Sequence, residues 1–185
     1  MRIIAGKYRS RIIKMPKTTA IRPTKDRIRE SLFGILGESV KGKIVLDLFA
    51  GSGAFGMEAL SRGAKLAIFV EGHARCISAI KENLTALEIE TEAYRVLRAD
   101  VFRAMAALEN KKEKFDLVLL DPPYNKDLAK KCLLVINRHD ILYPHCIIVA
   151  EHHKDDTLPG EVNNIINYRR VCYGEVCLSF FKLKA

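Results

Sequence analysis

The sequence contains no tryptophan, and aromatic residues make up only 8% of its 185 residues. It also has no apolar run of the roughly 20 residues that a membrane-spanning helix needs. Hydrophobic residues account for 49% and charged residues for 29%, which is ordinary for a globular protein. We therefore expect one globular unit with a sizeable core and no membrane association.

Cysteines and histidines are few and irregularly spaced. An odd number of cysteines without C-x-x-C spacing argues against a disulfide framework and against a zinc site. The five histidines show no ligand spacing, so we expect no metal, and the reducing cytoplasm is the expected location. The cysteines are Cys76, Cys132, Cys146, Cys172 and Cys177.

Basic residues are concentrated at the start of the chain. Residues 1–30 carry ten Lys or Arg against Asp26 and Glu30, whereas the remainder carries 21 basic against 20 acidic residues. Two short β-branched runs around Gly6 predict a hairpin at residues 2–13. A near-neutral body with one basic end is typical of a phosphate-binding element joined to a catalytic domain. We divide the chain into a basic hairpin extension, residues 1–20, which we expect to bind phosphates, and a catalytic domain, residues 21–185.

The body of the chain alternates short apolar runs with helical patterns. Such near-continuous apolar strands predict a parallel sheet covered on both faces, a doubly wound α/β fold. The end departs from this rhythm, because two strands flank Gly174 with no helix between them and predict an antiparallel hairpin. The expected strands begin near residues 44, 66, 94, 115, 146, 168 and 175, and the expected helices near residues 24, 54, 74, 101 and 126.

A glycine-rich turn follows the first apolar strand. Residues 47–56 contain G-x-G-x-x-G at Gly51, Gly53 and Gly56, where the backbone can turn sharply and approach a ligand closely. Glu71 ends the next strand, where a carboxylate can accept hydrogen bonds from ribose hydroxyls. The alternative is a tight turn with a surface glutamate. Together the two features predict a nucleotide-type cofactor.

The surrounding charges favour S-adenosylmethionine over a dinucleotide. A pyrophosphate needs positive potential at the turn, yet Asp47 precedes it and no Lys or Arg lies between residues 44 and 61. S-adenosylmethionine carries a sulfonium and an ammonium group, which suit carboxylates. Asp100 follows the third strand, where it can lie near the adenine ring or cap the next helix, and the two roles are compatible. The expected cofactor-binding residues are Asp47, Phe49, Ala50, Gly51, Ser52, Gly53, Glu71, Asp100 and Asp121.

Asp121-Pro122-Pro123-Tyr124 ends the fourth strand, at the edge where ligands bind in doubly wound sheets. An exocyclic base amine is a poor nucleophile unless acceptors hold its two hydrogens. The Asp121 carboxylate and the Pro122 carbonyl are such acceptors, Pro123 stiffens the loop, and Tyr124 offers a stacking face. We predict these four residues as the catalytic group. The alternative is a simple strand-ending turn.

These motifs, with Arg22-Pro-Thr-x-Asp-Arg-x-Arg-Glu30 and the opening Arg2–Gly6, resemble the RsmD family over essentially the whole chain. The resemblance implies a seven-stranded class I methyltransferase fold. It also implies methylation of guanine N2 in small-subunit (16S) ribosomal RNA, either free or within an assembly particle. We expect a monomer.

Three other functions compete with this interpretation. A DNA adenine-N6 methyltransferase shares the Asp121 motif, an NAD-dependent oxidoreductase shares the glycine turn, and a catalytically silent RNA-binding module shares the basic end. The arginines after residue 21 either contact phosphates or pair with Asp26 and Glu30 on an exposed helix face. The predicted RNA-binding residues are Arg2, Lys7, Arg9, Arg11, Arg22, Arg27 and Arg29.

Overall fold

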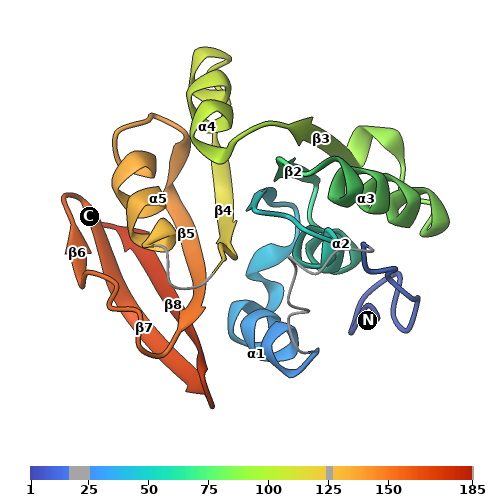
Figure 1. Cartoon of the computed structure of the whole chain (residues 1–185), viewed down its shortest axis with the longest axis horizontal. Helices are drawn as coiled ribbons and strands as arrows, with labels where there is room; N and C mark the ends of the chain where they lie inside the picture. Colours follow the sequence, from blue (N-terminus) through green and yellow to red (C-terminus); the bar gives the residue numbers. More distant parts are fainter. Residues whose placement is uncertain (17–25, 124–126, 185) are drawn as a thin grey trace.

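The computed structural model describes residues 1–16, 26–123 and 127–184, and their strands form one sheet in the order β3-β2-β1-β4-β5-β8-β7-β6 (Figure 1). Strands β1 to β5 are parallel, whereas β8 is antiparallel to β5 and β7, and β6 is antiparallel to β7. The predicted doubly wound fold with a C-terminal antiparallel hairpin is confirmed. The strands are β1 (Ile44–Leu48), β2 (Leu66–Glu71), β3 (Tyr94–Arg98), β4 (Phe115–Leu120), β5 (Leu142–His153), β6 (Glu161–Val162), β7 (Ile165–Tyr173) and β8 (Val176–Leu183).

The sheet has one strand more than the seven expected. The addition is β6, which is two residues long and lies in a stretch without a strand pattern. Two residues are too few to show the alternation by which a strand is recognised in a sequence.

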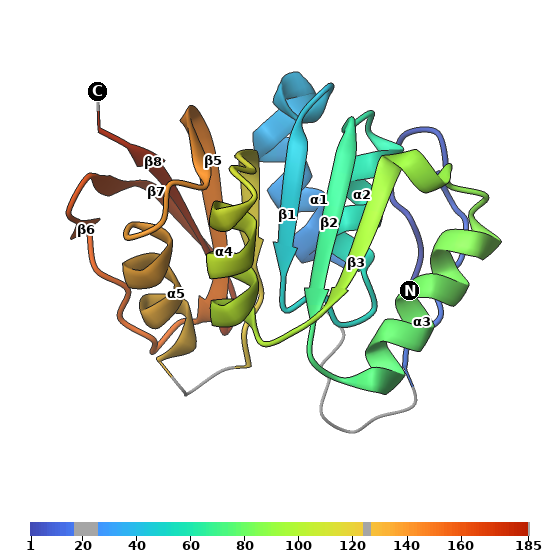
Figure 2. The same cartoon turned by 90° about the horizontal axis from the view of Figure 1, so that it is seen from above.

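Helices cover both faces of the sheet. Figure 2 shows α4 and α5 in front of the sheet and α1 and α2 behind it. Residues of α1, α2 and α3 share one apolar cluster with the sheet, and those of α4 and α5 share the other. We call these the α1 face and the α5 face. The helices are α1 (Asp26–Leu36), α2 (Ala54–Ser61), α3 (Ala74–Ala86), α4 (Val101–Asn110) and α5 (Leu128–Ile136), with 3₁₀ turns at Gly37–Val40 and Thr91–Ala93.

The N-terminal segment is a hairpin with little β structure. Arg2 and Ile12 form a single antiparallel bridge, because several backbone N–H groups bond to side chains of α2 instead of across a ladder. Glu58 accepts hydrogen bonds from the N–H groups of residues 4 and 5 at 2.8 and 3.1 Å. Ile3 and Ile13 are each 1% exposed and belong to the core on the α1 face. The extension is therefore packed onto the sheet domain.

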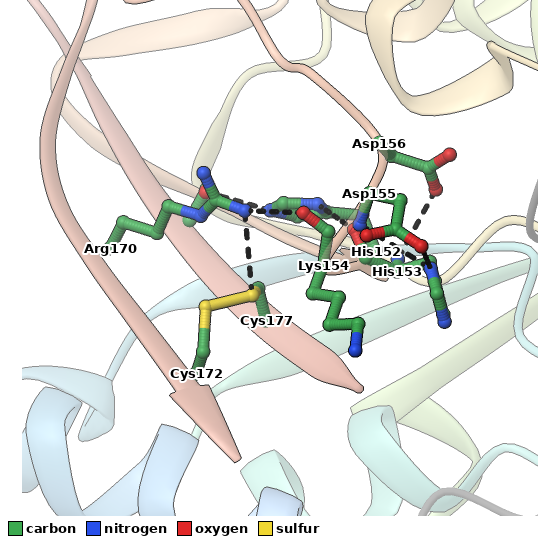
Figure 3. The surroundings of a disulfide bond; sticks show 9 residues. His152, His153, Lys154, Asp155, Asp156, Arg170, Cys172 and Cys177 are labelled. Carbon is green, nitrogen blue, oxygen red and sulfur yellow. Dashed lines mark hydrogen bonds and ion pairs between the residues drawn. A yellow bond between two sulfur atoms is a disulfide. The ribbon is translucent and has the colours of Figure 1, made fainter. Parts of the chain in front are cut away.

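Cys172 and Cys177 form a disulfide, contrary to the expectation from cysteine spacing. The two residues are register partners on β7 and β8, on either side of the tight turn, with a Cα–Cα distance of 4.0 Å. Hairpin register, which the C-x-x-C rule ignores, brings them together. Figure 3 shows Arg170 and Lys154 beside this bond.

Candidate active site

The glycine turn combines several unusual backbone conformations at the carboxyl end of β1. Phe49, Gly51 and Gly53 have φ of 62°, 56° and 80°, in the left-handed region that favours glycine. A Cβ on Gly56 would lie 2.3 Å from the Phe69 ring, so the first turn of α2 packs directly on β2. Side chains of the sheet therefore pack closely against the turn, and Ser52 and Gly53 are buried.

Glu71 is a structural partner of this turn. Its carboxylate accepts the Gly51 N–H at 2.9 Å and the His73 N–H at 2.8 Å, and the residue is 8% exposed. It is not the solvated surface glutamate of the alternative interpretation. Because each carboxylate oxygen can accept more than one hydrogen bond, these contacts leave room for a ribose hydroxyl.

Asp47 is a buried acid below the turn. It is 1% exposed, and its Oδ2 accepts the Gly56 N–H at 2.9 Å. Its Oδ1 has no hydrogen-bond partner among the described residues. Burial raises the pKa of Asp47 to about 8, and the carboxylates of Asp121 and Glu71 add to the effect. Such a site favours a cationic ligand, so these residues fit the ammonium and sulfonium of S-adenosylmethionine better than a pyrophosphate.

Asp121 lies half-buried after β4, followed by the buried Pro122 and the exposed Pro123. Leu119, two residues earlier, points to the α1 face, and side chains alternate along a strand, so Asp121 shares this face with Asp47. The predicted stacking residue Tyr124 lies outside the described residues.

Glu151 is an acidic neighbour of Asp121 that the sequence interpretation did not include. Leu120 pairs with Ala150 in register, so the next residues along, Asp121 and Glu151, are adjacent. Glu151 is 4% exposed. Pro122, Pro123 and Glu151 contribute to the lining of one small recess. The sequence does contain a signal for this residue, because Glu151 ends an apolar run in the same way as Glu71 does.

Asp100 caps a helix. Its side chain accepts the N–H groups of Phe102 and Arg103 at 3.0 and 3.3 Å at the start of α4. The N-cap role is therefore confirmed, whereas the contact with adenine stays a prediction.

The predicted RNA-binding residues separate into three groups. The prediction that Arg29 contacts RNA is wrong, because its side chain is 0% exposed. The guanidinium donates to the Arg2 carbonyl and, at 3.1 Å, to Asp26. The helical spacing from Arg29 to Phe33 and Leu36 places it on the buried side of α1. Arg22 lies outside the described residues. The exposed group consists of Arg2, Lys7, Arg9, Arg11 and Arg27.

Comparison with known proteins identifies the family to which the chain belongs. Residues 1–182 match the family described as conserved hypothetical protein 95. The chain is 38% identical over 182 residues to a putative rRNA methyltransferase, YlbH, of Bacillus subtilis, covering 98% of both chains. It is 31% identical to ribosomal RNA small subunit methyltransferase D of Escherichia coli, covering 100% of this chain and 91% of the relative.

Solved structures show the same architecture. A putative methyltransferase, yhhF, from Escherichia coli has a TM-score of 0.83 at 29% identity and covers 100% of this chain and 98% of its own. A hypothetical protein from Thermus thermophilus has a TM-score of 0.84 at 30% identity, with 99% of each chain covered. The chain therefore belongs to the family described as conserved hypothetical protein 95, the RsmD family of methyltransferases whose motifs it carries.

Proposed function

We propose that the protein transfers a methyl group from S-adenosylmethionine to the exocyclic N2 of a guanine in small-subunit ribosomal RNA. The observation that carries the proposal is the position of Asp121 and Pro122 on the same sheet edge as Asp47 and Glu71, because it brings an acceptor pair for an amine next to a cation-binding cofactor site. The names of the relatives indicate the RNA.

Asp47 and Glu71 hold the cofactor in this proposal. Glu71 accepts from the ribose, and the Asp47 carboxylate gains a cationic partner that offsets its burial. S-adenosylmethionine supplies an electrophilic methyl group on sulfur. The remaining predicted cofactor contacts are Phe49, Ala50, Gly51, Ser52 and Gly53 in the turn and Asp100 near the adenine.

Asp121 and the Pro122 carbonyl hold the nucleophile. They accept hydrogen bonds from the two hydrogens of the guanine amine, which draws its lone pair out of conjugation with the ring and toward the methyl carbon. The N–C bond forms as the S–C bond breaks, and the amine then loses one proton to Asp121 or to water. Positioning of this kind can contribute about 7–11 kcal/mol. Tyr124 is proposed to stack on the target base, which must leave its own stack to reach Asp121.

The exposed cations of the N-terminal segment are proposed to bind phosphates. Arg2, Lys7, Arg9 and Arg11 are exposed on the segment that Glu58 binds, and the exposed Arg27 lies in the first turn of α1. Within the described residues, no helix is both long and apolar enough to cross a membrane. We propose a cytoplasmic monomer that acts on rRNA. The location follows from the rRNA substrate, because the Cys172–Cys177 bond removes the argument from cysteine spacing. The same assay can compare naked rRNA with assembly particles.

The proposal is tested by labelled methyl transfer followed by nucleoside analysis. Wild-type protein should convert guanosine in small-subunit rRNA to N2-methylguanosine. Asp121→Ala should lower the rate at least ~100-fold, since misplaced reacting groups cost about this much, and the variant should still bind S-adenosylhomocysteine. Asp121→Asn, which keeps an acceptor oxygen, should lose less. Near-wild-type turnover by Asp121→Ala, or methylation of adenine in DNA instead, would overturn the proposal.

A further inference from the structure

The C-terminal hairpin carries an irregularity that concentrates basic and aromatic side chains on one surface. The pairing of β7 with β8 shifts between Asn167 and Arg169, so that Tyr168 is an extra residue and Tyr168 and Arg169 together oppose Phe180. A bulge of this kind breaks the alternation of side chains and re-aims them. The Tyr168 and Phe180 ring centroids are 6.2 Å apart, and Phe180 belongs to the core on the α1 face. Tyr168 and Arg169 are therefore both directed to that face.

Two further cations gather on the same surface. The Lys182 ammonium lies 5.8 Å from the centre of the Tyr168 ring, and the Arg27 guanidinium lies 5.6 Å from the centre of the Tyr173 ring. Tyr173 also hydrogen-bonds to Ser31 of α1, which joins the hairpin to that helix. We call Tyr168, Arg169, Tyr173 and Lys182, with the adjoining Arg27, the hairpin face.

The cations of the hairpin face are not neutralised by neighbouring acids. None of Arg27, Arg169 and Lys182 forms an ion pair within the described part of the chain. Tyr168 is 44% exposed, unusually open for so large a ring. Arg170 does not belong to this surface, because it turns to the opposite face and donates to the Lys154 carbonyl at 2.9 Å (Figure 3).

The hairpin face begins at the edge of the active site. His153 of β5 pairs with Val176 of β8, so the hairpin turn lies on the same edge of the sheet as Glu151 and Asp121. Tyr173 and Arg27 are at this end. The face then extends from Val176 to Lys182 along β8, about 20 Å at the usual rise per residue.

We propose that the hairpin face is a second RNA-binding surface, which holds the strand next to the target nucleotide. Arg169 and Lys182 bind phosphates beyond the one that Arg27 binds, and Tyr168 stacks with an unpaired base. Unpaired cations interleaved with exposed aromatic rings are the features with which proteins bind single-stranded nucleic acid. Nucleic acid fits better than a protein partner, because a phosphate backbone supplies a regularly spaced anion for each of the three cations. This inference rests on the proposed function.

The test measures the affinity of the whole protein for a small-subunit rRNA fragment across a range of salt concentrations. Each phosphate contact contributes about 0.7–0.9 to the slope of log K against log salt, so Arg169→Ala with Lys182→Ala should reduce the slope by about 1.5. Tyr168→Ala should weaken binding about fivefold or more, whereas Tyr168→Phe should retain wild-type affinity. Lys111→Ala, at the exposed end of α4, is the matched control. Binding of S-adenosylhomocysteine should not change in any variant.

The outcomes separate this inference from the proposed function. If wild-type protein methylates the rRNA and the double variant keeps the wild-type slope and affinity, the hairpin inference fails alone. A wild-type protein that binds the fragment but transfers no methyl group to it would overturn the proposed function, and the slopes would still decide the inference. A wild-type protein that does not bind the fragment would overturn both.

Discussion

Replacement of Asn83 should disturb two distant parts of the chain at once. Asn83 lies in α3 and is 1% exposed. Its Oδ1 accepts the Lys14 N–H at 2.8 Å, while its Nδ2 donates to the carbonyls of Lys14 at 2.9 Å and Ser52 at 3.2 Å. One side chain therefore ties the basic N-terminal segment to the glycine turn.

The magnitude follows from these three contacts. A hydrogen bond contributes about 0.5–1.5 kcal/mol net, and more is lost when a buried partner is left unsatisfied. Asn83→Ala should therefore lower the free energy of unfolding by about 3 kcal/mol, a substantial part of the 5–15 kcal/mol typical of a domain. At about 2–4 °C per kcal/mol for a chain of this size, Tm should fall by roughly 10 °C. Binding of S-adenosylhomocysteine should weaken, because the Ser52 carbonyl loses its tether.

Thermal unfolding and calorimetric titration with S-adenosylhomocysteine measure the two effects. Asn110→Ala, at the exposed end of α4, is the control for the loss of an amide. Asn83→Asp should be intermediate in stability, because it keeps the acceptor for Lys14 but loses the donors. An Asn83→Ala protein with wild-type Tm and wild-type cofactor affinity would refute the assignment.

Two further predictions concern buried charges. Arg29→Met should lower Tm, because the Arg2 carbonyl and Asp26 lose their partner, and should leave the salt dependence of RNA binding unchanged. Arg9→Ala should leave Tm unchanged and reduce the salt dependence. A reduced salt slope for Arg29→Met would contradict the structural role of Arg29. Burial raises the pKa of Asp47 to about 8 in the ligand-free folded state, whereas the pKa of an unfolded aspartate is about 3.9. Between these two values the folded state holds a proton that the unfolded state has released. The free energy of unfolding should therefore fall as pH rises from about 4 to 8. Asp47→Asn should remove this part of the pH dependence of Tm and weaken binding of S-adenosylhomocysteine; an unchanged pH profile would show that Asp47 is not the titrating group.

The elements that could be predicted from the sequence are those with strong local patterns. The apolar run of β1, the glycine turn and the acid at the end of β2 are each residue patterns typical of one local structure. The structure has all three where the sequence predicts them. Arg29 shows the limit of reading charge without position. Its charge predicts an RNA contact, whereas its spacing from Phe33 places it on the buried side of the helix.

Other features depend on contacts between segments. The bulge at Tyr168 is a one-residue slip of register, which does not alter composition or apolar spacing enough to be detected. Glu151 becomes a neighbour of Asp121 only when β5 pairs with β4. The Cys172–Cys177 bond requires the hairpin register, which the tight turn at Gly174 determines. In each case the missing information is the pairing of strands and not the preference of a residue.

The short helix α2 has a mechanical consequence. It starts at the glycine turn and, about 12 Å away at 1.5 Å per residue, its last turn grips the N-terminal segment through Glu58 and Ser61. The segment proposed to bind phosphates and the turn proposed to bind the methyl donor are therefore joined by one short helix, Ala54–Ser61. Because one short helix fixes the spacing between the two, an rRNA held by the N-terminal segment must span that spacing to present its target nucleotide to the methyl group.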